Sequence, residues 1–563
     1  MKKTIKVLTL VLFSALVLCT NLSSAITFYV SNTGNDSNTG DKIENPWKTI
    51  KRVNKHYFTP GDTISFKGGD TFKGAIDKHL DYDNSTDYVV INSYGSTKAT
   101  LYSEDNKVNA VIRIEFDKHI ALNISNLIIM GNYDPENMKG NPDLGIYIKN
   151  WTRTRDSTDQ SNFLINDCEI RNIKQAGIKI VPGNYGKRFN VSIENNHLHD
   201  CGQAGINFVY VWYSDCSIKN NKIHDIKGYP GGNGYSGIGI QLSLCKKIIC
   251  ERNLIYNVGK FADISGIAIL IGASKNIIVR YNEIYKVYGN SLYDAEAIDF
   301  ENGSDSCIAE YNYIHNTDGV GALISGSSKL SVANNQKLYM HDMDSSYADY
   351  NIIRYNIFKE CGNLNGLMSI KIASGDSKHK ARGNLIYNNT IVKKKTASWQ
   401  VAISLALPQD GTKIFNNIII TDLVRGIYID ALSNHINLSI LNNCYWDKKD
   451  YQIITIGEED YNLPDLINNQ NGLNNNTIEK INGVVVAKIY NPHLENPFTQ
   501  IDTVNNPYKI DTLSAYKFTS ASVMADNGLN LDSLFGINPG LTDFYGNSLM
   551  INGRSDIGAY EDN

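Results

Sequence analysis

The sequence predicts an all-β chain wound as a single-stranded parallel β-helix, a solenoid whose coils each contribute three short strands. A short asparagine phrase recurs at intervals of 25 to 44 residues, which is the spacing of a solenoid repeat. The residues between its copies are β-branched, alternate in polarity and are punctuated by Gly, Asn and Ser, without helical periodicity. A glycine-led aliphatic phrase recurs in step with the first.

The asparagine phrase consists of Asn, any residue, an aliphatic residue or Phe, and often an aromatic residue or His. Stacked at one corner of the coil, each side-chain amide could bond the amide of the next coil, about 4.8 Å along the axis. The asparagines concerned are Asn196, Asn221, Asn253, Asn282, Asn312, Asn356, Asn389, Asn417 and, in a weaker copy, Asn443.

The glycine-led phrase predicts two inward-facing columns, because alternate residues of a strand share a face. It begins at Gly177, Gly205, Gly237, Gly266 and Gly319. The first predicted column is Ile178, Ile206, Ile238, Ile267 and Val320, and the second is Ile180, Phe208, Ile240, Ile269 and Ala322.

The chain opens with a predicted signal peptide over residues 1–25. Lysines precede an apolar run at 7–19, which is too short to span a bilayer, and small residues favour cleavage after Ala25. Lipidation of Cys19 is the weaker alternative, because Leu18 is large for that motif. Residues 26–105 are expected to form an N-terminal cap and the first coils, 106–445 the regular β-helix, and 446–563 an extension packed on it.

Composition and charge exclude some classes of partner and location. The net charge of −4 excludes nucleic acid as a charge-driven partner. No later apolar run is long enough to span a membrane, so we expect a soluble monomer that is secreted, periplasmic or at the cell surface. The eight cysteines after residue 25 show no metal-ligand spacing and fall within apolar strands, which favours buried free thiols over disulfides.

Both ends of the chain resemble a known group. Residues 28–50, from Phe-Tyr-Val-Ser-Asn to Pro-Trp-Lys-Thr-Ile, resemble the opening of secreted right-handed parallel β-helix proteins, the pectate-lyase-like carbohydrate-active proteins. Residues 556–561, Asp-Ile-Gly-Ala-Tyr-Glu, resemble their C-terminal phrase. The resemblance implies a right-handed coil and a polysaccharide or oligosaccharide partner, but that superfamily includes lyases, glycosidases and non-catalytic binders.

One coil breaks the apolar pattern. Between Val287 and Ser328 there is no Lys or Arg, whereas the same stretch holds Asp294, Glu296, Asp299, Glu301, Asp305, Glu310 and Asp318. Taken literally, the repeat would bury Asp299 and Glu301 in an aliphatic core, at a cost of several kcal/mol each. A one-residue bulge would instead turn Ile298 and Phe300 inward and both carboxylates outward. Asp299 would then lie among the small residues Gly239, Ala268 and Gly321.

The acidic coil predicts a glycoside hydrolase. Carboxylates on one strand face lie about 7 Å apart and those on adjacent coils about 5 Å apart, which are the separations of glycosidic hydrolysis. We expect Glu296, Asp299 and Asp318 to share the acid and base roles. Supporting substrate contacts are expected from Asp294, Glu301, His315 and His341. This reaction requires no cofactor, although Asp294, Glu296 and Asp299 could instead bind calcium.

Other interpretations stay open. The resemblance implies, for a lyase acting on uronic-acid polymers, a Lys or Arg base and often calcium; Arg280 and Lys329 flank the acidic coil. A non-catalytic binding or surface protein is a third class. Asp305 and Glu310 fit structural roles at turns. His199, His224, Tyr256, Tyr285 and His315 share one repeat position and predict a stacked structural ladder, with His315 singled out because it lies on the acidic coil.

Overall fold

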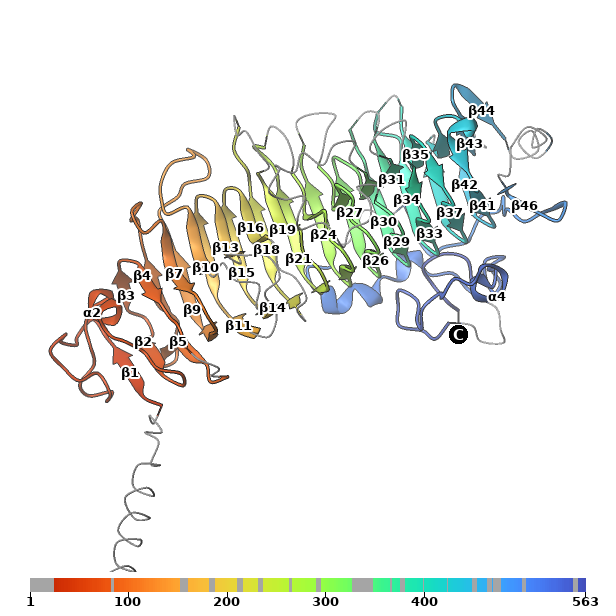
Figure 1. Cartoon of the computed structure of the whole chain (residues 1–563). Coiled ribbons are helices and arrows are strands. Elements are labelled where there is room, and N and C mark those ends of the chain that lie inside the picture. Colours follow the sequence, from red (N-terminus) through yellow and green to blue (C-terminus); the bar gives the residue numbers. More distant parts are fainter. Residues whose placement is uncertain are drawn as a thin grey trace, which may run out of the picture.

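The computed structural model shows a long tower of stacked coils (Figure 1). The structure describes residues 25–82, 86–151, 160–181, 188–209, 216–230, 236–262, 266–289, 295–326, 348–364, 367–374, 380–397, 399–422, 424–447, 453–462, 468, 477–498, 503–549 and 555–562.

Three long sheets run along the tower, and each coil contributes one strand to each sheet in the order A, B, C. Sheet A comprises β1 (Thr27–Val30), β2 (Thr63–Lys67), β5 (Val89–Tyr94), β8 (Ala121–Ser125), β11 (Gln160–Asn166), β14 (Arg188–Glu194), β17 (Cys216–Lys219), β20 (Ile248–Glu251), β23 (Ile278–Arg280), β26 (Ile308–Glu310), β29 (Ile352–Arg354), β33 (Leu385–Tyr387), β37 (Lys413–Phe415), β41 (Ser439–Leu441) and β45 (Thr477–Ile478). Sheet B comprises β3 (Thr71–Lys73), β6 (Ala99–Tyr102), β9 (Leu127–Met130), β12 (Glu169–Ile173), β15 (His197–Cys201), β18 (Lys222–Ile226), β21 (Leu254–Val258), β24 (Glu283–Val287), β27 (Tyr313–Thr317), β30 (Ile357–Cys361), β34 (Thr390–Lys394), β38 (Ile418–Asp422) and β42 (Cys444–Asp447). Sheet C comprises β4 (Ile76–His79), β7 (Ala110–Phe116), β10 (Leu144–Asn150), β13 (Ala176–Val181), β16 (Ala204–Val209), β19 (Ile238–Ser243), β22 (Ile269–Gly272), β25 (Ile298–Glu301), β28 (Ala322–Ser325), β31 (Met368–Ala373), β35 (Val401–Ala406), β39 (Arg425–Ile429), β43 (Ile454–Ile456) and β44 (Glu459–Tyr461).

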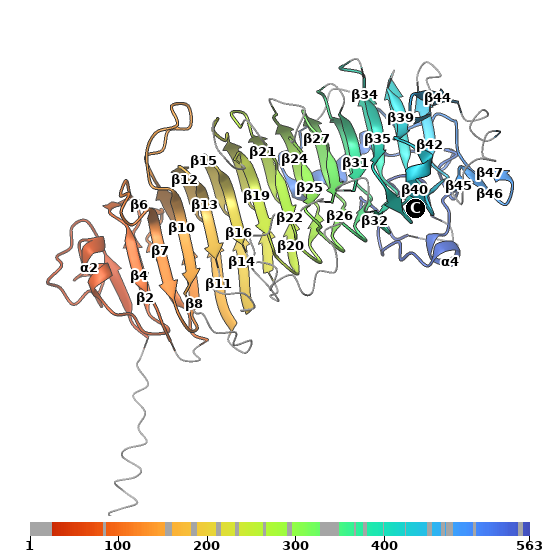
Figure 2. The same cartoon turned by 45° about the horizontal axis from the view of Figure 1, so that its top comes forward.

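Every pairing along these sheets is parallel except that of β43 with β44. Figure 2 shows the strands of sheet C side by side along the tower. Two small sheets complete the strands: β32 (Ala381–Arg382), β36 (Gln409–Asp410) and β40 (His435–Ile436), and the pair β46 (Lys480–Ile481) and β47 (Val484–Val485). The predicted all-β parallel β-helix is confirmed.

The predicted asparagine ladder is present at the corner between sheets A and B. From Asn196 to Asn443, each buried side-chain amide donates from Nδ2 to the Oδ1 of the next asparagine, at 2.9–3.1 Å. The ladder ends on a carboxylate, because Asn443 Nδ2 donates to Glu479 Oε1 at 2.9 Å. The buried side-chain amides at this corner thereby satisfy one another's hydrogen bonds.

One part of the predicted column register is wrong. Ile206 pairs with Ile240, and Ile240 with Ile269, so the core column of sheet C does not pass through Ile238 or Ile267. Ile238 and Ile267 belong to a separate apolar cluster, with Leu270 and Tyr147, on the outer face of the sheet. A bend at the start of each strand causes this, because two consecutive residues there, such as Ala268 and Ile269, both belong to the core.

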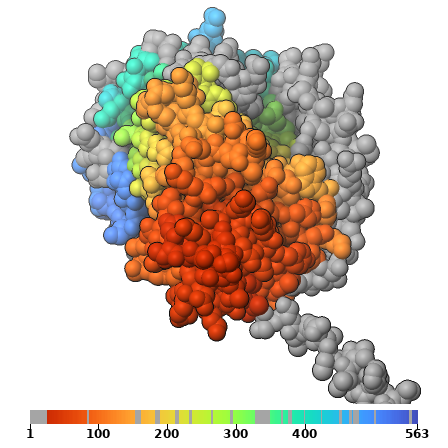
Figure 3. All heavy atoms as spheres, turned by 90° about the vertical axis from the view of Figure 1, so that its left-hand side faces the viewer, coloured from red at the N-terminus to blue at the C-terminus, as the bar shows by residue number. Residues whose placement is uncertain are grey.

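Both ends of the tower carry additional structure. At the first end, helix α2 (Ile50–Lys55) is capped by the Thr49 hydroxyl and packs with the buried Trp47; Figure 3 views the molecule from this end. In its described residues, the segment after Asp447 carries three short helices, η3 (Pro507–Thr512), η4 (Ser514–Tyr516) and α4 (Leu531–Phe535). Its apolar residues form a second core with outward residues of sheets A and B. A further short 3-10 helix, η1, spans Leu432–Asn434.

The eight cysteines in the described part of the chain are free and buried, as predicted. None of the helices among the described residues is long and apolar enough to cross a membrane. The predicted signal peptide and the alternative at Cys19 lie outside the described residues, apart from Ala25.

Candidate functional site

Strand β25 carries the acidic coil. The predicted orientation of its side chains is confirmed, but there is no bulge in the strand, because β25 pairs residue for residue with β22 and β28. Ile298 and Phe300 are fully buried members of the core. Asp299 lies between them and therefore faces the outer side of sheet C. Its register partners are Leu270 on the preceding coil and Leu323 on the next. The prediction that Gly239, Ala268 and Gly321 surround Asp299 is wrong, because those positions form the bend that begins each strand.

Glu296 lies on the same outer face, just before β25. The Ala268 N–H donates to Glu296 O, and the Ala297 N–H donates to Val320 O. These bonds place Glu296 in register with Ile267 and Val320. On this coil, Glu296 thus interrupts an apolar outer column, and Asp299 lies between two leucines in a column that is otherwise mainly polar.

Burial distinguishes these two carboxylates from ordinary surface acids. Glu296 is 4% and Asp299 2% exposed, whereas Glu301 at the end of β25 is partly exposed. Glu301 is the register partner of Gly272. A Cβ atom added at Gly272 would meet no atom within 4 Å. The outer face therefore combines two buried carboxylates with open space beside a third.

Asp318 lies at the turn that leads from β27 towards β28, two residues before Val320. Its Oδ2 accepts the Gly289 N–H at 3.3 Å, from the corresponding turn of the preceding coil. Burial raises the pKa of Asp318, although this hydrogen bond opposes the shift. Because Val320 is in register with Glu296, Asp318 and Glu296 lie along the same edge of sheet C on consecutive coils.

Comparison with known families agrees with this architecture. A family described as "Right handed beta helix region" matches residues 157–337. The match covers only part of the chain, and the structure extends the parallel β-helix beyond it on both sides. No curated protein matches it.

Solved structures similar to this β-helix protein are distant. Pectate lyase Pel9A is 12% identical, with 96% of this chain and 98% of that chain covered and a TM-score of 0.39. XylC in complex with xylose is 10% identical, with 77% and 86% covered and a TM-score of 0.40. DFA-IIIase from Arthrobacter chlorophenolicus A6 in complex with GF2 is 12% identical, with 74% and 94% covered and a TM-score of 0.38. Similarity this distant assigns no chemistry to the present chain.

His315 lies on a different sheet of the β-helix from Asp299. It is fully buried on sheet B, where its Nε2 is 3.4 Å from Glu283 Oε1. Glu283 also accepts the Val504 and Asn506 N–H groups, so the C-terminal segment is docked onto this part of sheet B. His315 is thereby separated from the acidic face, which corrects its predicted place in the site.

The stacked ladder on sheet B is present as predicted. Consecutive ring centroids lie 4.7–5.2 Å apart, with interplanar angles of 2–12°. Its rings belong to His199, His224, Tyr256, Tyr285 and His315. This regular stacking on adjacent coils supports a structural role for the whole column, His315 included.

Other acidic residues of the coil form structural ion pairs. Asp305 Oδ2 lies 2.8 Å from Lys275 Nζ, and Glu310 Oε2 lies 2.6 Å from Arg354 Nη2. Both therefore have structural partners, but these are cationic side chains and not the turns that were expected, and Glu310 lies within β26. Arg280, the alternative lyase base, is on sheet A and pairs with Glu251 at 2.6 Å. Asp294, His341 and Lys329 lie outside the described residues.

Several residues of the outer face were not identified from the sequence. Lys371 is the register partner of Leu323 and therefore lies two coils from Asp299 in the same outward column. Trp399 and Tyr428 form an edge-to-face pair further along this face, with centroids 5.4 Å apart. These residues could be identified only from their register with Asp299. That register depends on the bend at the start of each strand, which the repeat phrases do not reveal.

Proposed function

We propose that this β-helix protein is a polysaccharide-degrading glycoside hydrolase, exported from the cell, whose active site is the outer face of sheet C at β25. The observation that carries the proposal is the pair Glu296 and Asp299. Both are almost fully buried and face outward, and the register partners of both on the coils immediately before and after are apolar. Burying carboxylates is costly, so a surface that needed only stability would not favour them here.

The proposed roles follow from the environment of each carboxyl group. Asp318 is assigned as the general acid, because burial raises its pKa and so favours the protonated form. Asp299 is assigned as the base or nucleophile, since it lies within β25 on the outer face of sheet C. Glu296 lies between these two groups and would tune their charges. Glu301, beside the open space at Gly272, would contact the sugar.

The same two carboxylates could also bind calcium. Glu296 and Asp299 offer carboxylate oxygens on one face, which is the ligand type that calcium prefers. The hydrolase reaction itself requires protons and water, and both can be handled by carboxyl groups.

A lyase is the second candidate, and Lys371 is the observation that favours it. This lysine is the cationic side chain that follows Asp299 and Leu323 in the outward column. A lyase removes a proton next to a uronic acid carboxylate, and a lysine near such a face could act as the base.

The test uses purified protein and a panel of neutral and uronic polysaccharides, with and without EDTA. Reducing ends and ultraviolet absorbance near 235 nm are followed together. Reducing ends without absorbance support the hydrolase. Absorbance at this wavelength shows a lyase and contradicts the hydrolase, and its loss in Lys371→Met would assign the base. Activity that EDTA abolishes and calcium restores would add a calcium site.

A further inference from the structure

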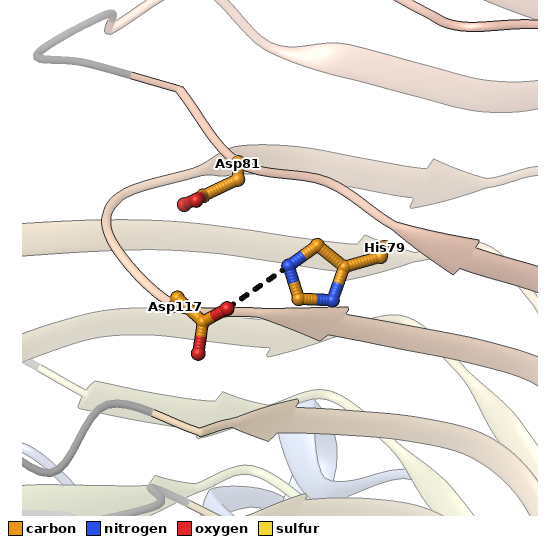
Figure 4. A group of neighbouring side chains, drawn as sticks. All are labelled: His79, Asp81 and Asp117. Carbon is orange, nitrogen blue, oxygen red and sulfur yellow. Dashed lines mark ion pairs between the residues drawn. The ribbon is translucent and has the colours of Figure 1, made fainter.

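A separate group of possible ligands lies near the first end of sheet C. His79 ends β4, Asp81 follows it by two residues, and Asp117 comes directly after β7 on the next coil. One nitrogen or oxygen atom from each of the three residues lies within 4.8 Å of the other two. Figure 4 shows the His79 ring and the two carboxylates around one corner of the coil. Among the described residues, no other three His, Cys, Asp or Glu side chains converge this closely.

The backbone fixes the relative positions of these three residues. His79 pairs in register with Glu115, and the Leu80 N–H donates to Glu115 O at 2.9 Å. Beyond Asp81, the Tyr82 N–H donates to His119 O across the same two coils. The three side chains are therefore placed by strand pairing on both sides of the corner.

The side chains are also suitably oriented. His79 Nε2 lies 3.2 Å from Asp117 Oδ2, and one oxygen of Asp81 accepts the Lys118 N–H at 2.7 Å. The His79 and Asp117 side chains are each 50% exposed. An ion pair this exposed contributes at most about 1 kcal/mol, so the pair alone gives little reason for a third ligand to converge on it.

We propose that His79, Asp81 and Asp117 bind a divalent first-row transition metal ion, with Zn²⁺ as the representative. The imidazole distinguishes this group from an acidic surface patch, because imidazole nitrogen favours such ions over calcium and magnesium. Ligand atoms about 2.0–2.2 Å from an ion lie roughly 3–4 Å apart, a range that includes the 3.2 Å between His79 Nε2 and Asp117 Oδ2. Exposure of the group leaves room for water to complete the coordination.

The bound ion would link β4 to β7, the first two strands of sheet C. Seven strand-to-strand steps separate β4 from β25, or about 34 Å at ~4.8 Å per step. The proposed metal site is thus independent of the proposed hydrolase, and neither result depends on the other.

Isothermal titration of EDTA-treated, dialysed protein with Zn²⁺, and separately with Ca²⁺, tests the site. We expect one saturable Zn²⁺ site per chain that Ca²⁺ does not occupy at the same concentration. His79→Gln and Asp81→Asn should each weaken Zn²⁺ binding at least tenfold. The matched controls His493→Gln and Asp511→Asn replace exposed residues elsewhere and should leave it unchanged.

Thermal unfolding gives a second readout. Zn²⁺ should raise the melting temperature of the wild type and of both controls, and should not raise that of His79→Gln. The proposal is overturned if no saturable Zn²⁺ binding occurs, if both site variants bind as tightly as the wild type, or if Ca²⁺ binds equally well. If a site variant fails to fold, the remaining variant and the comparison of Zn²⁺ with Ca²⁺ still decide.

Discussion

Gly272 and Glu301 are register partners on adjacent strands of sheet C, and the space where a Gly272 side chain would begin is open. The glycine thus leaves room beside Glu301, the partly exposed carboxylate at the end of β25. Its backbone conformation is not left-handed, so other residues fit there without strain.

Filling this space should block the substrate without affecting the fold. Gly272→Trp is expected to lower kcat/KM at least tenfold, mainly through a higher KM, because the indole would occupy the position of a sugar ring. Gly272→Ala is the control and should stay within about twofold. Kinetics on the substrate found by the polysaccharide panel would check this, and full activity of Gly272→Trp would place the substrate elsewhere.

The proposed acid role of Asp318 predicts a distinct pH profile. Burial raises the pKa of this carboxyl, so it keeps its proton to higher pH than an ordinary aspartic acid. As pH rises through the pKa of Asp318 the acid is lost, so kcat/KM should fall on the alkaline limb. Asp318→Asn should cost about a hundred- to ten-thousand-fold and remove that limb. A substrate with a good leaving group should restore much of the rate; an unaltered alkaline limb would exclude the role.

The asparagine ladder should be a main source of stability. Asn312 Oδ1 accepts from the N and Nδ2 of Asn282, and its own Nδ2 donates to Val279 O and Asn356 Oδ1. Asn312→Ala removes these four hydrogen bonds between buried groups and is expected to cost about 2–4 kcal/mol. Urea unfolding measures the effect, with the exposed Asn137→Ala as control. A shift no larger than that of the control would show that the ladder contributes little.

The carboxylate at the end of the ladder predicts a pH-dependent stability. Burial raises the pKa of Glu479 to about 7, although its hydrogen bonds from Asn443 and Tyr445 oppose the shift. Between pH 4.5 and 7 the folded state therefore holds a proton that the unfolded state has released. The free energy of unfolding should fall as pH rises through this window, by on the order of 3 kcal/mol.

Glu479→Gln keeps an acceptor for Asn443 and Tyr445 but cannot ionise. The difference in unfolding free energy between this variant and the wild type should grow from pH 4.5 to 7 and be constant above. Measuring both proteins across the same pH range cancels the contributions of other buried acids, such as Asp543 and Asp556. A difference that does not vary with pH would contradict the assignment.

The sequence was sufficient to predict the coil, the asparagine ladder and the outward orientation of Asp299. The ladder has a fixed side chain at a fixed corner, and the orientation of Asp299 follows from the cost of burying carboxylates. The bulge that was expected to produce this orientation is absent, because β25 pairs residue for residue with its neighbours. The column register was not predictable in the same way. Gly237 and Gly239 are two residues apart, and the repeat phrase aligned the first with Gly205, whereas the structure aligns the second.

A shift of two residues preserves the alternation of a strand, so the polarity pattern cannot detect it. The bend that places Ala268 and Ile269 both in the core also breaks the alternation locally. For the same reason the sequence did not reveal that Leu270 and Leu323 flank Asp299. The repeat also gave no sign that the C-terminal segment docks on Glu283, beside His315, and so separates this histidine from the acidic face.

The central claim is that outward carboxylates on β25 carry the chemistry, and Asp299→Asn tests it most directly. The substitution keeps the shape of the side chain and removes its charge. We expect kcat/KM to fall by about a hundred- to ten-thousand-fold with unchanged circular dichroism and melting temperature. The exposed control Asp511→Asn should retain full activity. Full activity of a folded Asp299→Asn variant would contradict the proposed site.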